Sequence, residues 1–334
     1  MCIYILAAIF PIIVTFLLLK YTRKNNSVSF LGSLITNFFK LLNKISSKEN
    51  GKTIMVKAMK TTNKTYDFNS WKAPKGYKNE EISLKNCKAY LLSKEISNHK
   101  KVVYQLHGGG YVKNFIKMYN KIALRYSENY DNADVFSLDY RVAPENIFPK
   151  ALEDAIEGYR WLISSGYKAC NIVIAGDSAG GGLALALTLY LRDKSLEMPK
   201  ALILSSPWSD LTLKGESYKT KAKEDVFFGS VKWKDNFEIS LPVSYAKGMD
   251  AKNPYISPVY GSYENMPPML VQTGSIEIFL SDSITVVEKA LKSGVNAKFI
   301  EYELMYHTFY VITPFIKESR RAWREIKSFI ESLN

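Results

Sequence analysis

The sequence predicts an α/β protein with a mostly parallel central sheet, helices on both faces of the sheet and one membrane-spanning helix at the N-terminus. Two observations carry this prediction. From about residue 80 onward, expected strands and helices alternate along the chain. Such alternation is typical of parallel sheets, in which helices connect successive strands. Before that region, residues 1–19 contain no charged side chain.

The uncharged N-terminal segment, MCIYILAAIFPIIVTFLLL, is close to the ~20 apolar residues that cross a bilayer. A soluble helix normally keeps one polar face, and this segment has none. It also lacks the basic start and small-residue cleavage site of a signal peptide, so we predict a retained anchor. Lys20, Arg23 and Lys24 follow the segment, and the positive-inside rule then places the rest of the chain on the cytoplasmic side.

Composition excludes several classes of protein. Hydrophobic residues make up 47% and charged residues 23% of the 334, which excludes a disordered, collagen-like or polytopic membrane chain. The formal charge is +13, but the lysines are spread along the chain, which favours a solvated basic surface over nucleic-acid binding. The three cysteines, Cys2, Cys87 and Cys170, show no CxxC spacing, which argues against a disulfide framework and a zinc site.

Apolar residues recur at helical spacing over residues 29–45, which predicts an amphipathic helix that lies on a membrane surface or covers a site in the folded domain. Further along the chain we expect strands at 101–106, 133–138, 171–175, 201–205, 269–273 and 297–302. We expect helices at 149–163, 178–191, 282–292 and 315–330. Residues 211–253 interrupt this alternation and are interpreted as an insertion over the sheet.

A G-x-S-x-G motif spans residues 176–180, between an expected strand and an expected helix. This is the setting of a nucleophile elbow, a sharp turn that exposes a serine hydroxyl, here that of Ser178. A glycine-rich helix start that binds phosphate is the alternative, but no Walker lysine follows the motif.

A second glycine motif, His107-Gly108-Gly109-Gly110, follows the strand at 101–106. Consecutive glycines let backbone N–H groups face the oxyanion of a tetrahedral intermediate. We predict that the N–H groups of Gly108, Gly109 and Ala179 form this oxyanion hole. His107 is expected to hold the loop rather than to transfer protons.

The order of catalytic residues in such a fold is serine, acid, histidine. His307 is the only histidine after Ser178, and it follows the strand at 297–302, so it is the expected base. Glu277, a few residues past the strand at 269–273, is the expected acid. Asp282 is the alternative, although it resembles the N-terminal acid of the next helix.

With these residues in place, the chain resembles the hormone-sensitive-lipase-like family of α/β-hydrolases, including the arylacetamide-deacetylase and acetyl-esterase types. The resemblance covers about residues 100–310 and includes HGGG, LDYRVAPE, FPKALEDA, GDSAGGGLA, SPWSDL and NPYISP. It implies the α/β-hydrolase fold, a nucleophile at Ser178, a base at His307 and an acid at Glu277, where the family usually has Asp.

The resemblance also implies a cap, built from the N-terminal helices and the insertion near 211–253. We therefore expect an anchor at 1–19, juxtamembrane and cap helices at 20–75 and a catalytic domain at 76–334. An N-terminal anchor is also found in the arylacetamide-deacetylase branch, whose members face the lumen, the opposite side from that indicated by the basic residues here.

The implied activity is hydrolysis of short- to medium-chain acyl esters by a serine carboxylesterase or deacetylase, without a cofactor or metal. A non-catalytic small-molecule receptor on the same fold is one alternative. An amidase or a lipase with the same triad is another. Tyr111, Trp208 and the pair Phe227 and Phe228 are candidates to line the pocket or to pack in the core.

Overall fold

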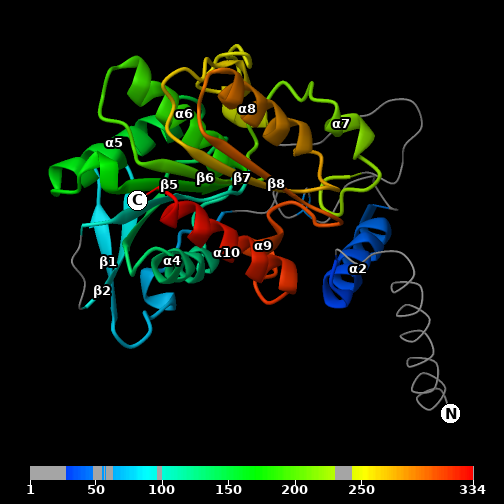
Figure 1. The fold of residues 1–334 in the computed structure, drawn as a ribbon, viewed down its shortest axis with the longest axis horizontal. Coiled ribbons are helices and arrows are strands. Elements are labelled where there is room, and N and C mark those ends of the chain that lie inside the picture. Colours follow the sequence, from blue (N-terminus) through cyan, green and yellow to red (C-terminus); the bar gives the residue numbers. More distant parts are fainter. Residues whose placement is uncertain are drawn as a thin grey trace.

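The structure, a computed structural model, describes residues 28–47, 55, 57, 63–95, 100–229 and 243–333. Its centre is one eight-stranded sheet with the strand order β1-β2-β4-β3-β5-β6-β7-β8 (Figure 1). The strands are β1 (Tyr77–Ser83), β2 (Lys88–Lys94), β3 (Val102–Leu106), β4 (Asp134–Asp139), β5 (Ile172–Asp177), β6 (Ala201–Ser205), β7 (Met269–Gly274) and β8 (Ala297–Tyr302).

From β4 to β8 all neighbouring strands are parallel, whereas β2 pairs antiparallel with β1 and β4. Every residue of β3, β5, β6 and β7 is buried. This explains their apolar sequences, because a parallel strand covered on both faces has no side that favours polar residues. The predicted mostly parallel sheet is thus confirmed.

Helices cover both faces of the sheet (Figure 1). One face carries α5 (Lys150–Ser164), α6 (Ala179–Asp193) and α8 (Leu280–Lys292), and the other carries α4 (Met118–Asn129) and α10 (Lys317–Glu331). Each strand and helix expected from the sequence in the body of the protein is present, with its ends within two residues of the predicted ones.

The hairpin β1–β2 and the helix α4 were not expected from the sequence. β1 lies at the edge of the sheet, where its sequence YKNEEIS is partly exposed throughout. An edge strand of this kind lacks the apolar alternation that marks a half-buried strand. α4 is polar overall, and it buries only part of its surface.

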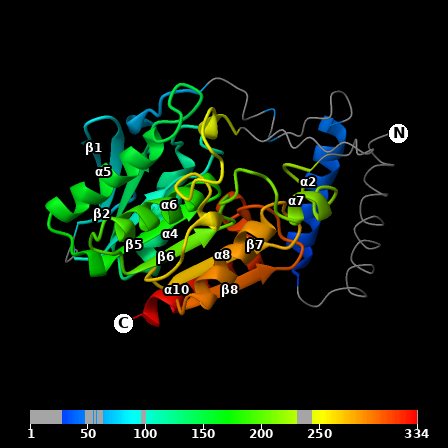
Figure 2. The same cartoon turned by 90° about the horizontal axis from the view of Figure 1, so that it is seen from above.

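The amphipathic helix predicted at 29–45 is α2 (Phe30–Ser47), which lies on the β8 side of the molecule in both views (Figure 1 and Figure 2). Its Asn43 side chain donates hydrogen bonds to the carbonyl oxygens of Asp225, at 3.4 Å, and Gly229, at 3.1 Å. Its Phe39 ring lies 5.2 Å from that of Phe227. The two segments expected to form a cap, α2 and the part of the insertion that ends at Gly229, are therefore in contact.

The predicted anchor at 1–19 lies outside the described residues. Within the described ranges, none of the helices combines the length and the apolar composition that a bilayer span requires.

Candidate active site

Ser178 lies between the end of β5 and the start of α6, as the motif predicted. Its backbone has φ 53° and ψ −122°, a region that a non-glycine residue occupies only under strain. Ser178 N–H donates to the carbonyl of Ser205 at 2.9 Å, and its own carbonyl accepts from Trp208 N–H at 2.9 Å. These bonds to the next strand and loop hold the strained turn in place.

The glycines of this turn are required by close backbone contacts. A Cβ atom on Gly176 would lie 2.3 Å from the carbonyl oxygen of Gly180, and one on Gly180 would lie 2.1 Å from that of Leu106. Both distances are far inside van der Waals contact. The strand, the turn and the helix approach this closely only because both positions lack a side chain.

His307 and Glu277 are in direct contact. Nδ1 of His307 lies 2.5 Å from Oε2 of Glu277, and both side chains are buried. Glu277 follows β7 and His307 follows β8. Because these neighbouring strands are parallel, the two loops meet at the carboxyl ends of the strands. A carboxylate at Nδ1 fixes the tautomer and the ring orientation of the histidine and leaves Nε2 for proton transfer.

The second oxygen of Glu277 is held by three donors. Its Oε1 accepts hydrogen bonds from Ser206 Oγ at 2.7 Å, Thr273 Oγ1 at 2.5 Å and Gly274 N–H at 2.7 Å. Ser206 Oγ in turn accepts from Thr308 N–H, next to His307, at 3.1 Å. The carboxylate is therefore oriented by its surroundings and does not depend on His307 alone.

Asp282, the alternative acid, has a different role. Its Oδ2 accepts from the backbone N–H groups of Ser209, at 2.9 Å, and Asp210, at 2.8 Å, and from the Tyr218 hydroxyl at 3.1 Å. Burial, with the nearby Asp210 charge, raises the pKa of Asp282 well above its usual range. Asp282 thus holds the turn after β6, whereas Glu277 contacts the histidine.

Aromatic rings enclose His307. The rings of Phe279 and Phe228 lie 4.6 and 5.3 Å from the imidazole. Phe228 is placed by Asp225, whose Oδ1 accepts hydrogen bonds from the N–H groups of Phe227 and Phe228 at 2.8 Å each. Of the aromatic candidates from the sequence, Phe228 lines the cavity beside His307, while Tyr111 and Trp208 are almost fully buried in the core.

The loop at residues 107–110 is held in a way that the motif did not reveal. Gly108 N–H donates to the Tyr119 hydroxyl at 2.9 Å and to Oδ1 of Asp177 at 3.2 Å. The Tyr119 hydroxyl donates to Oδ2 of the same aspartate at 3.1 Å. By contrast, no hydrogen bond joins the N–H of Gly109 or Ala179 to another described residue. Of the three N–H groups predicted to bind the oxyanion, those of Gly109 and Ala179 make no hydrogen bond to a described residue, whereas that of Gly108 makes two.

Asp177 and Tyr119 are site residues that the sequence reasoning missed. Asp177 directly precedes the serine, and it lines the same cavity as Ser178 and His307. Burial raises the pKa of Asp177 to about 6, although its bonds to Tyr119 and Gly108 oppose the shift. The one feature of the sequence that could have pointed to Asp177 is its position inside the G-x-S-x-G motif. Tyr119 lies on α4, which was itself not expected.

His107 is buried and packs flat on Tyr140, with ring centroids 4.2 Å apart. The Tyr140 hydroxyl donates to the His107 carbonyl at 2.7 Å, and His107 Nδ1 lies 2.7 Å from the Gly108 carbonyl oxygen. Burial lowers the pKa of His107, which favours the neutral ring. These contacts match the predicted role of holding the loop.

A cavity of about 420 Å³ joins these groups, and Ser178, His307, Gly108 and Gly109 all lie on its wall. The rest of its lining combines the charged residues Lys64, Lys113 and Asp177 and a few uncharged polar residues with apolar side chains, those of Met55, Ile116, Met118, Phe228, Val311 and Ile312. A volume of this size is typical of a site for a small organic molecule.

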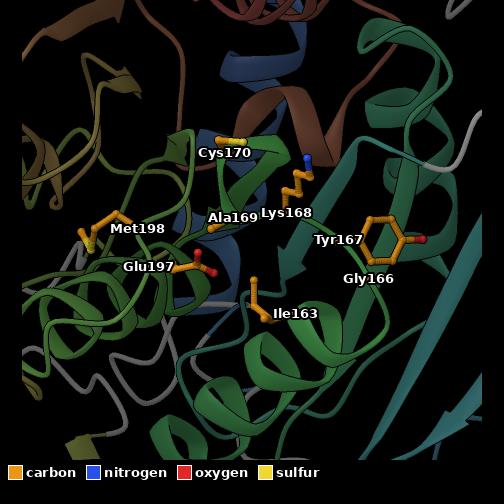
Figure 3. A pocket seen from close by; sticks show the side chains of 8 residues that line it. All are labelled: Ile163, Gly166, Tyr167, Lys168, Ala169, Cys170, Glu197 and Met198. Atoms are coloured by element: carbon orange, nitrogen blue, oxygen red, sulfur yellow. The ribbon is translucent and has the colours of Figure 1, made fainter.

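A second depression, of about 610 Å³, is lined by residues that directly precede β5 (Figure 3). Lys168, Cys170 and Glu197 are among its lining residues, which include no histidine or serine. In α/β proteins ligands bind at the carboxyl ends of the parallel strands, where Ser178 lies. The first cavity is therefore the candidate active site. Within the described ranges, no cluster of three or more His, Cys, Asp or Glu side chains could hold a metal ion.

Comparison with known proteins identifies the fold family. Residues 103–311 match the family model of an alpha/beta hydrolase fold. The chain is 31% identical to an acetyl-hydrolase of Streptomyces hygroscopicus over 75% of its length and 82% of the relative. It is 32% identical to an esterase of Acinetobacter venetianus over 70% of its length and 75% of the relative.

Solved structures give the same result. An esterase/lipase from an uncultured bacterium superposes with a TM-score of 0.75 at 32% identity, covering 90% of this chain and 98% of that one. An esterase from the bacterial hormone-sensitive lipase family superposes with a TM-score of 0.74 at 27% identity, covering 89% and 97%. The chain thus belongs to the hormone-sensitive-lipase-like family of α/β hydrolases and is a serine ester hydrolase.

Proposed function

We propose that this protein is a carboxylesterase that hydrolyses short- to medium-chain acyl esters through Ser178, His307 and Glu277. The observation that supports this most directly is the contact between Glu277 and Nδ1 of His307, beside a cavity that also contains Ser178. A serine is a weak nucleophile unless a neighbouring base accepts its proton, and a base held by a carboxylate is the usual solution.

In the proposed reaction, Nε2 of His307 takes the proton of Ser178 Oγ as the oxygen bonds to the acyl carbon. The negative charge then develops on the carbonyl oxygen, and Glu277 stabilises the imidazolium. When the tetrahedral intermediate collapses, the C–O bond to the alcohol breaks and His307 returns the proton to the departing oxygen. Water, deprotonated by His307, then attacks the acyl-enzyme and releases the acid and Ser178.

The oxyanion is assigned to the N–H groups of Gly109 and Ala179, which have no other partner among the described residues. Ala179 is the first residue of α6, so the positive end of the helix dipole supports negative charge at the same place. Gly108 N–H is a third donor once it turns from Asp177 and Tyr119 toward the substrate.

The apolar part of the lining supports the binding of an acyl group. The cavity of about 420 Å³ suits a small ester, and Val311 and Ile312 are on its wall. Lys64, Lys113 and Asp177 are also on this wall. We propose that the acyl part of the substrate, which contacts the apolar side chains, dominates the choice of substrate.

The test is hydrolysis of p-nitrophenyl esters from acetate to palmitate, by wild type and by Ser178→Ala, in detergent. We expect rates that fall as the acyl chain lengthens and a loss of roughly 10⁴–10⁶ in kcat for the variant. A maximum at long chains would instead indicate a lipase. No hydrolysis of any ester by folded wild type would favour a receptor or an enzyme for a narrow amide substrate.

For location, we propose that residues 1–19 anchor the protein in a membrane, with the catalytic domain on the cytoplasmic side. Support comes from the uncharged sequence of this segment and from Lys20, Arg23 and Lys24 after it. Membranes from expressing cells, washed with alkaline carbonate, should retain the protein, and protease should cleave the domain only from the cytoplasmic side. Release of the protein by carbonate would refute the anchor.

A further inference from the structure

Helix α2 has an apolar face that is left about half exposed. Its exposed large side chains recur at intervals of three and four residues, so they form one stripe along the helix. The members of this stripe are 39–56% exposed: Leu31, Leu34, Phe38, Leu41 and Ile45. A single exposed leucine is ordinary, but five large apolar side chains on one helix face normally require an apolar partner.

The opposite face of α2 is fixed to the body of the protein. Thr36 donates to the Leu304 carbonyl at 3.2 Å, and the Phe39 ring lies 5.2 Å from the ring of Tyr306, the residue before His307. Together with the bonds from Asn43, these contacts hold α2 against the loops that enclose the catalytic histidine. The exposed stripe therefore cannot be buried by rolling the helix inward without breaking these contacts.

The charges of this region fit an anionic surface. Helix α2 contains Lys40 and Lys44 and no acidic residue. Residues 20–29 add Lys20, Arg23 and Lys24, again without an acid. A basic amphipathic helix with one apolar face is the form that lies in the headgroup region of a bilayer.

We propose that the exposed stripe of α2 docks on the surface of an anionic lipid bilayer. This inference rests in part on the membrane location proposed above. If residues 1–19 are anchored, residues 20–29 reach at most roughly 35 Å, so α2 stays near the same bilayer. A second copy of the chain could also cover the stripe, but the basic residues of two facing helices would then repel each other.

Docking of this kind places the catalytic site at the membrane. One face of α2 then contacts lipid. Its other face contacts Phe227 and Tyr306, whose neighbours in the sequence, Phe228 and His307, pack against each other. Substrate then enters the apolar cavity from the bilayer surface, where esters with poor water solubility accumulate.

The test uses the full chain with its three cysteines replaced by serine, reconstituted into vesicles of brominated phosphatidylglycerol and phosphatidylcholine. An environment-sensitive nitrobenzoxadiazole label is attached through Leu41→Cys or, as the matched control, through Leu291→Cys on α8. Both leucines are 55% exposed. We expect strong quenching by bromine at position 41 and little at 291. Adding Phe38→Gln and Ile45→Gln should remove most of the quenching at 41.

Equal quenching at the two positions would overturn the proposal. So would a dimer in detergent that Phe38→Gln and Ile45→Gln dissociate, because the stripe would then bind a second copy. Hydrolysis of soluble p-nitrophenyl butyrate by each labelled chain reports the active site separately. A failure of docking is thus distinguished from a failure of the esterase assignment, and carbonate extraction tests the anchor by itself.

Discussion

The hydroxyl of Tyr119 lies 3.1 Å from Oδ2 of Asp177, the residue that directly precedes Ser178. The same hydroxyl accepts a hydrogen bond from Gly108 N–H, which links the serine turn to the glycine loop. One side chain thus sets the distance between the two parts of the site that must act on the same acyl group. Misplacement of such groups by a fraction of an ångström is enough to slow catalysis.

Tyr119→Phe should therefore lower kcat by roughly tenfold with little change in KM, because one hydrogen bond of this kind contributes about 1–1.5 kcal/mol. Loss of the phenol also removes a donor that lowers the pKa of Asp177. Any titration of Asp177 in the pH profile should consequently move to higher pH. Tyr126→Phe, at a buried tyrosine of the same helix, is the control and should leave kcat unchanged. An unchanged kcat and pH profile in Tyr119→Phe would contradict the positioning role.

Stability should depend on pH through Asp177. Burial raises the pKa of this carboxyl to about 6 from 3.8. Below pH 3.8 both folded and unfolded chains hold the proton, so no penalty exists. Between pH 3.8 and 6 the unfolded chain loses this proton before the folded chain does, so the free energy of unfolding falls as the pH rises. At pH 7 the loss is complete and amounts to about 3 kcal/mol.

Asp177→Asn removes this penalty and keeps the shape of the side chain. Thermal denaturation of both proteins should give a similar Tm near pH 4 and a higher Tm for the variant at pH 7. If the difference in Tm between variant and wild type were the same at both pH values, a raised pKa of Asp177 would be excluded.

Glu277 and Asp282 should behave differently on substitution. Glu277→Gln removes the carboxylate that fixes the tautomer of His307 and should lower kcat by roughly 10³–10⁴. Asp282→Asn preserves acceptance of the Ser209 and Asp210 N–H groups and should keep kcat within a few-fold of wild type. Steady-state kinetics on p-nitrophenyl butyrate measures kcat for both variants. A larger loss of kcat in Asp282→Asn than in Glu277→Gln would assign the role of acid to Asp282.

Gly180→Ala should prevent formation of the nucleophile turn. The added methyl group would lie 2.1 Å from the Leu106 carbonyl oxygen, which is backbone and has no room to move. We expect little soluble protein or a loss of several kcal/mol in stability. Gly166→Ala meets no atom within 4 Å and bears only the strain of φ 94°, about 1 kcal/mol. Similar chemical denaturation of both variants would contradict the packing described for Gly180.

The sequence was sufficient to predict the elements that surround the candidate site. Strands such as β5 and β6 are buried on both faces, so their apolar runs are visible in the sequence itself. The strained turn at Ser178 was predictable because the glycines that its close backbone contacts require are visible in the sequence as a motif. The choice of Glu277 followed from its place after β7, and the structure brings this residue to His307.

What could not be predicted depends on contacts between distant segments. Tyr119 and Asp177 are 58 positions apart in the sequence, and no local pattern relates them. Gly108 N–H donates its hydrogen bonds to these same two side chains. The glycine motif could not reveal this, so it predicted three equivalent N–H donors for the oxyanion. Likewise, the periodicity of α2 indicated an amphipathic helix, but only the packing of Phe39 and Asn43 shows which face is left exposed.

The central claim is that Ser178, activated by His307, forms the acyl-enzyme. Its most direct test is to treat the protein with p-nitrophenyl butyrate and quench rapidly, then to map the butyryl group by peptide mass spectrometry. We predict one butyryl group on Ser178, formed at the rate of the p-nitrophenol burst, and none in Ser178→Ala. A butyryl group on another residue, or turnover by Ser178→Ala within tenfold of wild type, would contradict the mechanism.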